Sequence, residues 1–123
     1  RFFRRIGYGD CQMKSNLEHL WYGSGVKISA MEQVELLKGL CSNGFGAEPQ
    51  NIAAVKEAIA LNESGFYGKT GTGRLEDANI AGWFIGFVES PENTRFIAVY
   101  LNSPEGADGA AAYEIACRIL EKI

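Results

Sequence analysis

Two neighbouring stretches decide the fold: YGKTGTG at residues 67–73 and IAGWFIGFVE at residues 80–89. The first has too many glycines for a helix and predicts a strand that other backbone segments can approach closely. The second is a short, nearly continuous apolar run, which is typical of a buried strand. Pro91-Glu92-Asn93 predicts a turn, so residues 94–102 should form a third strand that pairs with the second as a hairpin.

Helices are predicted before and after these strands in the sequence. Ser29 and Glu32 have the spacing of a capping box, which indicates a helix start, and that helix should end near residues 42–44. A second helix is expected over residues 49–61, and a last one from Asp108 to the C-terminus. The residues of the last helix that should face inward are Ala112, Ile115, Ala116, Ile119 and Leu120. The pattern predicts an α+β fold, with helices packed on an antiparallel sheet.

The overall composition excludes several classes of partner. A chain of 123 residues suits one domain, and its net charge of −3 argues against nucleic acid or an anionic membrane surface, since either favours a basic patch. No run approaches the ~20 apolar residues of a membrane span, and no signal peptide is visible. The chain opens at Arg1 instead of a methionine, and we expect it to be a piece of a longer protein.

The sequence gives no indication of a metal or a cofactor. The three cysteines, Cys11, Cys41 and Cys117, have neither the spacing of a zinc site nor that of a disulfide framework. The single histidine, His19, is more typical of a surface or core residue than of a catalytic base. We therefore predict that the chain binds no metal and no cofactor.

Lys69-Thr70-Gly71 is the strongest candidate for chemistry. A lysine supplies positive charge for an anionic substrate, a threonine hydroxyl can bond a carboxylate, and a glycine allows another backbone to come close. A backbone N–H just beyond the glycine can point at a developing oxyanion. K-T-G is one of three signatures of β-lactamases and penicillin-binding proteins, although the tripeptide alone is more typical of a glycine-rich turn.

Further motifs in the same order resemble class D β-lactamases and the sensor domain of membrane-anchored β-lactam sensor-transducers. The matching segments are Tyr8-Gly9-Asp10 with the Y-G-N motif, Trp21 and residues 26–35 with the omega loop and its following helix, residues 67–73 and 82–89 with the K-T-G region, and residues 109–123 with the C-terminal helix. The resemblance covers essentially the whole chain. Enzymes and sensors share these motifs, so the resemblance indicates the superfamily and leaves the activity open.

The resemblance also implies roles for individual residues. Lys69 matches the active-site lysine of K-T-G, and the backbone N–H of Thr72 would be one oxyanion donor, so these two are the predicted catalytic residues. The predicted substrate-binding residues are Tyr8, Gly9, Trp21, Thr70 and Gly71. The hydroxyls of Thr70 and Thr72 match positions near the carboxylate of the bound ligand.

The nucleophile of this family lies in an S-x-x-K motif on a helix well upstream of Y-G-N, and the chain begins after that point. Ser24-Gly25-Val26-Lys27 has the literal pattern, but it falls in a predicted loop. The helical spacing that would aim Lys27 at Ser24 is therefore absent. We expect residues 1–123 to be the C-terminal part of a penicillin-binding transpeptidase-like or class D β-lactamase-like domain, inactive alone.

Three positions depart from the family pattern. Asp10 stands where the family usually has asparagine, so an acceptor-only carboxylate replaces an amide that can also donate. Tyr22 stands where the enzymes often have leucine. The start of the last helix, residues 109–113, lacks the arginine with which many enzymes hold the substrate carboxylate. Lys69 and the two threonine hydroxyls remain as anchors.

Three functions stay open at this point. The main hypothesis is penicillin binding by the K-T-G half of a serine acyl-transfer site from a class D-like β-lactamase. The alternatives are a membrane-anchored sensor domain that is acylated without turnover, and a fragment that only binds or assembles. The expected ligand is a β-lactam or a D-Ala-D-Ala-like molecule, and the parent protein is expected outside the cytoplasm. Because strand residues 80–88 carry large apolar side chains for both faces, we also expect self-association or pairing with the absent N-terminal part.

Ser24 provides a direct test of the missing nucleophile. We expect that a fluorescent penicillin incubated with this chain gives no labelled band on denaturing electrophoresis, because no helix aims Lys27 at Ser24. A labelled band that disappears in Ser24→Ala would contradict this expectation.

Overall fold

The computed structural model of the chain describes residues 2–11 and 27–123. Its elements in chain order are helices α1 (Phe2–Ile6), α2 (Ala30–Cys41) and α3 (Pro49–Ala58), strands β1 (Phe66–Leu75), β2 (Ala78–Glu89) and β3 (Thr94–Asn102), and helix α4 (Gly109–Leu120). The α+β order predicted from the sequence is confirmed. In the part of the chain that the structure describes, no helix is both long and apolar enough to cross a membrane.

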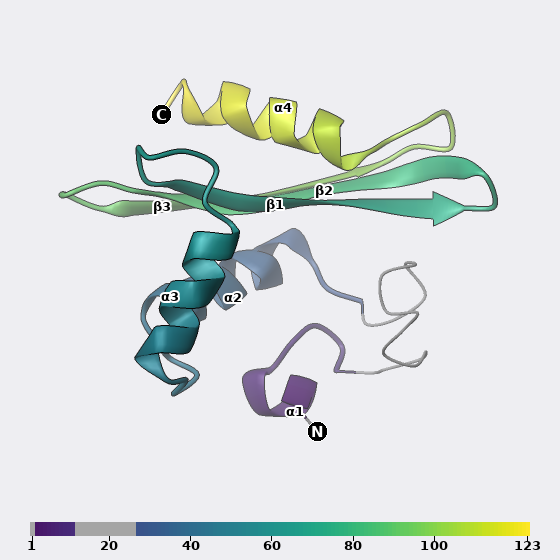
Figure 1. Cartoon of the computed structure of the whole chain (residues 1–123). Coiled ribbons are helices and arrows are strands. Elements are labelled where there is room, and N and C mark those ends of the chain that lie inside the picture. Colours follow the sequence, from purple (N-terminus) through teal and green to yellow (C-terminus); the bar gives the residue numbers. More distant parts are fainter. Residues whose placement is uncertain (1, 12–26) are drawn as a thin grey trace.

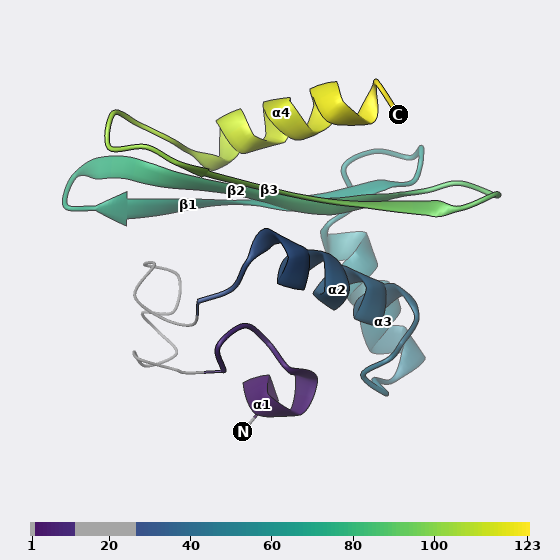
Figure 2. The same ribbon diagram turned by 180° about the vertical axis from the view of Figure 1, so that it is seen from behind.

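The three strands form one antiparallel sheet in the order β1-β2-β3. Thr72 of β1 lies opposite Gly82 of β2, and the register shifts just beyond, between Gly73 and Arg74. Figures 1 and 2 show α4 along one face of the sheet and α2 with α3 against the other, with α1 farther out on the same side as α2. The sheet is therefore the middle layer of three.

The core on the α4 face is centred on Phe84, which is fully buried and packs with Ile97, Ala112 and Ala116. The two alanines lie one turn apart on α4 and let the helix come close to the sheet. Ile115 and Ile119 were predicted to face inward, and this is wrong, because 37% and 42% of their surfaces are exposed. The narrow contact is made by small residues, so the larger apolar side chains of α4 flank it.

The start of α2 is built as the sequence predicts. The Ser29 hydroxyl accepts a hydrogen bond from the Glu32 N–H at 3.2 Å, and the Glu32 carboxylate accepts from the Ser29 N–H at 2.8 Å. The Ser29 hydroxyl also donates to the Glu32 carboxylate at 2.8 Å, and the bonds from the Ser29 N–H and hydroxyl hold the pKa of the Glu32 carboxyl below its ordinary value. The helix then buries Leu37 and Gln33.

Helix α3 ends at Ala58, before the predicted end at Leu61, because the chain there pairs with β1 instead. The Gly68 N–H donates to the Ile59 carbonyl at 2.8 Å, and the Leu61 N–H donates to the Phe66 carbonyl at 2.9 Å. Farther back on α3, the Lys56 ammonium pairs with Glu89 at the end of β2 and lies 5.3 Å from the centre of the Tyr67 ring. Together these contacts hold α3 against one end of the β1–β2 hairpin.

Helix α4 begins in direct contact with β2. The carbonyl oxygen of Asp108, the residue that caps α4, would lie 1.9 Å from a Cβ built on Gly82. We expect Gly82→Ala to lower the free energy of unfolding by about 1–3 kcal/mol, because α4 or β2 must shift. Gly71→Ala is the matched control, since its added Cβ would have no neighbour closer than 3.7 Å. Chemical denaturation measures both variants, and equal losses would contradict the prediction.

Candidate ligand-binding site

The K-T-G residues lie in β1, on the edge of the sheet that faces away from β2. Lys69, Thr70, Gly71 and Thr72 are all exposed. The Gly68 N–H points away from β2, because it donates to Ile59, and backbone groups of a strand alternate between its two edges. The N–H and C=O groups of Thr70 and Thr72 therefore also point outward. Among the described residues, no strand covers this edge beyond Gly68.

The outward N–H of Thr72 suits the role predicted for it. A backbone N–H that is fixed by a strand and is not used in the sheet can donate to an oxyanion without reorganising. Only one side of β1 is paired with β2, and Thr72 lies opposite Gly82 there. The position is consistent with an oxyanion donor, and that role remains a prediction.

The side chains of the K-T-G segment divide between the two faces of the sheet. A Cβ on Gly68 would lie 2.4 Å from the Phe84 ring of the α4-side core, so Thr70 and Thr72 also face α4, since side chains alternate along a strand. The side chain of Lys69 starts from the opposite face of the sheet, because it alternates with those of Gly68 and Thr70. Its ammonium nevertheless donates to the Thr70 carbonyl at 2.7 Å. That carbonyl points outward, so the positive charge lies at the open edge of β1.

The start of α4 lies against β1 at the K-T-G segment. The Gly109 N–H donates to the Thr72 Oγ at 3.0 Å. A Cβ on Gly109 would lie 2.8 Å from the Thr70 Cβ and 3.0 Å from the Gly71 carbonyl oxygen, so only glycine fits without displacement. Helix α4 therefore begins directly against the K-T-G segment, at the place where many class D enzymes are expected to carry an arginine and where this chain carries none.

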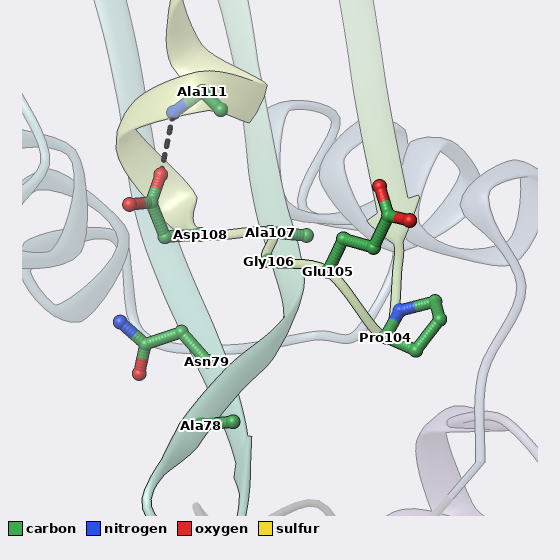
Figure 3. A pocket seen from close by; sticks show the side chains of 8 residues that line it. All are labelled: Ala78, Asn79, Pro104, Glu105, Gly106, Ala107, Asp108 and Ala111. Carbon is green, nitrogen blue, oxygen red and sulfur yellow. Dashed lines mark hydrogen bonds between the residues drawn. The ribbon is translucent and has the colours of Figure 1, made fainter.

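A pocket of about 350 Å³ lies beside the start of α4 (Figure 3). The residues that line it are Ala78, Asn79, Pro104, Glu105, Gly106, Ala107, Asp108 and Ala111. The Asp108 carboxylate accepts a hydrogen bond from the Ala111 N–H at 2.8 Å, as the dashed line in Figure 3 shows. The charged side chains in the lining are both acidic, and none of the K-T-G residues belongs to it. The pocket therefore does not suit an anionic ligand.

Tyr8 lies on the other side of the sheet, among residues of α1 and α2. It is half-buried and lines a pocket of about 110 Å³ whose lining includes Leu36 and Phe45 but no K-T-G residue. Its hydroxyl accepts a hydrogen bond from the Gln33 Nε2 at 3.4 Å. The predicted cleft of Lys69, Thr70, Thr72, Tyr8 and Trp21 stays a prediction, because Trp21 lies outside the described residues.

The loop after Tyr8 is fixed to the segment that leads into α2. Gly9 has a φ of 55°, in the left-handed region that favours glycine. The Asp10 N–H donates to the Lys27 carbonyl at 2.8 Å, and the Asp10 carboxylate accepts from the Lys27 N–H at 3.2 Å. The carboxylate of Asp10 thus acts as an acceptor in this contact, a role that an asparagine side chain can also perform. His19, Tyr22 and Ser24 lie outside the described residues.

Cys41 is not an activated nucleophile. Cys41 and Cys117 are free thiols, and burial raises the pKa of the Cys41 thiol. A raised pKa keeps the thiol protonated and weakens it as a nucleophile. Within residues 2–11 and 27–123, no group of three or more metal-ligating side chains could hold a metal ion. The absence of a metal and a cofactor remains a prediction.

Sequence reasoning missed one residue of this site. Gly109 was noted only as part of a helix start without arginine, whereas the structure places its N–H on the Thr72 hydroxyl. The two residues are separated by 37 positions in the chain, so no local pattern could have indicated the contact.

Comparison with known proteins identifies the family. Residues 60–121, about half of the chain, match the penicillin binding protein transpeptidase domain. The chain belongs to this family.

Individual relatives agree with this assignment. The chain is 39% identical to the regulatory protein BlaR1 of Bacillus licheniformis over 98% of its length, and it covers 20% of that protein. The structure of the C-terminal domain of the Bacillus licheniformis BlaR penicillin-receptor matches with a TM-score of 0.89 and 40% identity, over 98% of this chain and 50% of that one. A class D β-lactamase from Bacillus subtilis matches with a TM-score of 0.85 and 27% identity, over 98% and 50%.

The chain corresponds to only part of each of these relatives. The chain spans about a fifth of the BlaR1 sequence and half of each of the two structures. What is shown is thus a portion of a penicillin-binding transpeptidase fold.

Asp10 offers a test of the contact that holds this loop. We expect Asp10→Asn to change the free energy of unfolding by less than about 0.5 kcal/mol, since the amide oxygen can accept the same bond and a like charge near Glu32 is removed. Asp10→Ala should cost about 1 kcal/mol, because the acceptor of the Lys27 N–H is lost. Thermal unfolding of both variants checks this, and an asparagine as costly as alanine would show that the charge is required.

Proposed function

We propose that the chain is the C-terminal half of the receptor domain of a β-lactam sensor. The observation that carries the proposal is that sequence identity is higher to a penicillin-receptor domain than to a class D β-lactamase, although both match the same share of this chain. Identity is 40% to a penicillin-receptor domain and 27% to a class D β-lactamase, each over 98% of this chain. The sequence analysis put the β-lactamase first and the sensor second, and the relatives favour the second.

In this proposal the chain supplies one wall of a serine acyl-transfer site. The serine of the intact protein attacks the β-lactam carbonyl carbon, the ring C–N bond breaks, the nitrogen takes a proton, and an ester remains on the serine. The Lys69 ammonium and the hydroxyls of Thr70 and Thr72 attract the ligand carboxylate. The outward N–H of Thr72 stabilises the oxyanion, and Gly71 lets the ligand lie against the strand.

The opposite wall would come from the remaining predicted residues. Tyr8 and Gly9 belong to the motif that faces K-T-G in the resembling family, and Trp21 corresponds to the tryptophan beside the carboxylated lysine. The Asp10–Lys27 contact supports the loop that presents Tyr8. The signal of a sensor is a long-lived ester, so the proposal requires slow deacylation. The receptor domain would act outside the cytoplasm and pair with the N-terminal half of the same domain.

A class D-like β-lactamase is the second candidate. The fold match to the Bacillus subtilis enzyme, with a TM-score of 0.85, supports it. The two functions share every step up to the ester and differ only in whether water then attacks it. The absence of an arginine at the start of α4 also distinguishes this chain from many of the enzymes.

The lifetime of the ester separates the two functions. We expect the full-length protein that contains this chain to bind a fluorescent penicillin covalently and to keep the label after excess ligand is removed. Hydrolysis of a chromogenic cephalosporin should stop after about one equivalent, because the ester persists. Repeated turnover would identify an enzyme, and failure to form an ester would overturn both functions.

Lys69 tests the site itself. In the full-length protein, Lys69→Ala should lower the second-order acylation rate about tenfold to a hundredfold, since one charged contact to the ligand is lost. Lys122→Ala is the matched control, because Lys122 is an exposed lysine at the C-terminal end of the chain. Equal rates in the two variants would contradict the role of Lys69.

A further inference from the structure

The hydroxyl of Thr72 is held from one side by the start of α4. Its Oγ accepts a hydrogen bond from the Gly109 N–H at 3.0 Å, and this contact is partly buried. Gly109 is the first residue of a helix of 12 residues, so its N–H has no acceptor within the helix. The contact therefore satisfies a backbone donor that the helix leaves unpaired.

This bond decides what the hydroxyl can offer to a ligand. A threonine hydroxyl has one proton to donate and two lone pairs that accept. One lone pair is used by Gly109, and the proton cannot point toward another donor. Within residues 2–11 and 27–123, the Thr72 hydroxyl donates to no acceptor. Since Thr72 is exposed, its proton is available to a ligand at the edge of β1.

The position of Gly109 depends on its having no side chain. Gly109 is buried, and an added Cβ would lie 2.8 Å from the Thr70 Cβ, 3.0 Å from the Gly71 carbonyl oxygen and 3.1 Å from the Gly71 nitrogen. Two of these three neighbours are backbone atoms, which cannot turn aside as a flexible side chain can. Any larger residue must therefore push the start of α4 away from β1 and lengthen the bond to Thr72.

We infer that Gly109 is a positioning residue for the ligand carboxylate: its N–H orients the Thr72 hydroxyl so that the hydroxyl proton is donated to that carboxylate. The inference rests on the proposed function, because it assumes an anionic β-lactam at the edge of β1. In this chain the Gly109–Thr72 contact supplies a directed donor at a helix start that has no arginine. Gly109 itself does not touch the ligand.

The test compares an acidic ligand with its neutral ester in the full-length protein. The second-order acylation rate is measured for benzylpenicillin and for its methyl ester, and the acid-to-ester ratio is the readout. Gly109→Ala and Thr72→Val should each lower this ratio about tenfold, because a charge-assisted hydrogen bond to the carboxylate is lost or misdirected. Thr72→Ser keeps a hydroxyl at this position and should keep the ratio.

A control separates positioning from general loosening of α4. Ala116 is fully buried against the sheet, away from the start of the helix, so Ala116→Gly should lower the melting temperature and leave the ratio unchanged. Gly109→Ala should lower the acid-to-ester ratio whether or not it also lowers the melting temperature. If Gly109→Ala does not fold, hydrogen exchange decides: the Gly109 amide should exchange faster in Thr72→Val than in the wild type, and equal exchange would overturn the inference.

The outcomes distinguish the inference from the function beneath it. A wild-type protein that forms no acyl ester overturns the proposed function, and the inference with it. A wild type that is acylated, with a ratio unchanged in Gly109→Ala, overturns the positioning role and leaves the proposed function standing. Equal slowing of acid and ester in Gly109→Ala also overturns it, because the residue would then be only structural.

Discussion

The structure depends on the close approach of α4 to the β1–β2 hairpin. Two glycines make it possible, since a Cβ on Gly82 would lie 1.9 Å from the Asp108 carbonyl oxygen and a Cβ on Gly109 would lie 2.8 Å from the Thr70 Cβ. With the helix start in this position, Ala112 and Ala116 of α4 pack on Phe84 and complete the core on that face. The same contact fixes the end of the K-T-G segment, so packing and the candidate site share one constraint.

The opposite face is held by different chemistry. There the Lys56 ammonium bridges from α3 to Glu89 and lies over the Tyr67 ring, and the hydrogen bond with Glu89 raises the pKa of Lys56. This contact fixes one end of the hairpin, whereas α4 fixes the segment near Thr72. The edge of β1 between them keeps its outward backbone groups and the Lys69 charge exposed. The edge is thus supported at both ends without being covered by a further strand among the described residues.

The fold alone does not separate a sensor domain from a class D enzyme. The BlaR penicillin-receptor domain and the Bacillus subtilis class D β-lactamase match this chain with TM-scores of 0.89 and 0.85, so the backbone of this portion is common to both. Deacylation requires a water molecule and a base placed on the ester. The resemblance assigns that base to a lysine outside this chain, and the neighbouring Trp21 lies outside the described residues. Identity, rather than geometry, is what favours the sensor.

The sequence by itself determined the secondary structure and the family, because these follow from local patterns. The capping box at Ser29, the glycine-rich strand and the apolar run of β2 each act within a few residues, and all appear in the structure as predicted. Helix boundaries and the burial of single side chains were less predictable. Helix α3 ends early because the Ile59 carbonyl accepts from the Gly68 N–H. Ile115 is exposed because Ala112 and Ala116 make the contact with the sheet. Only the tertiary structure placed the Gly109 N–H on the Thr72 hydroxyl, since a contact across 37 positions arises from packing and leaves no periodic signal in the chain.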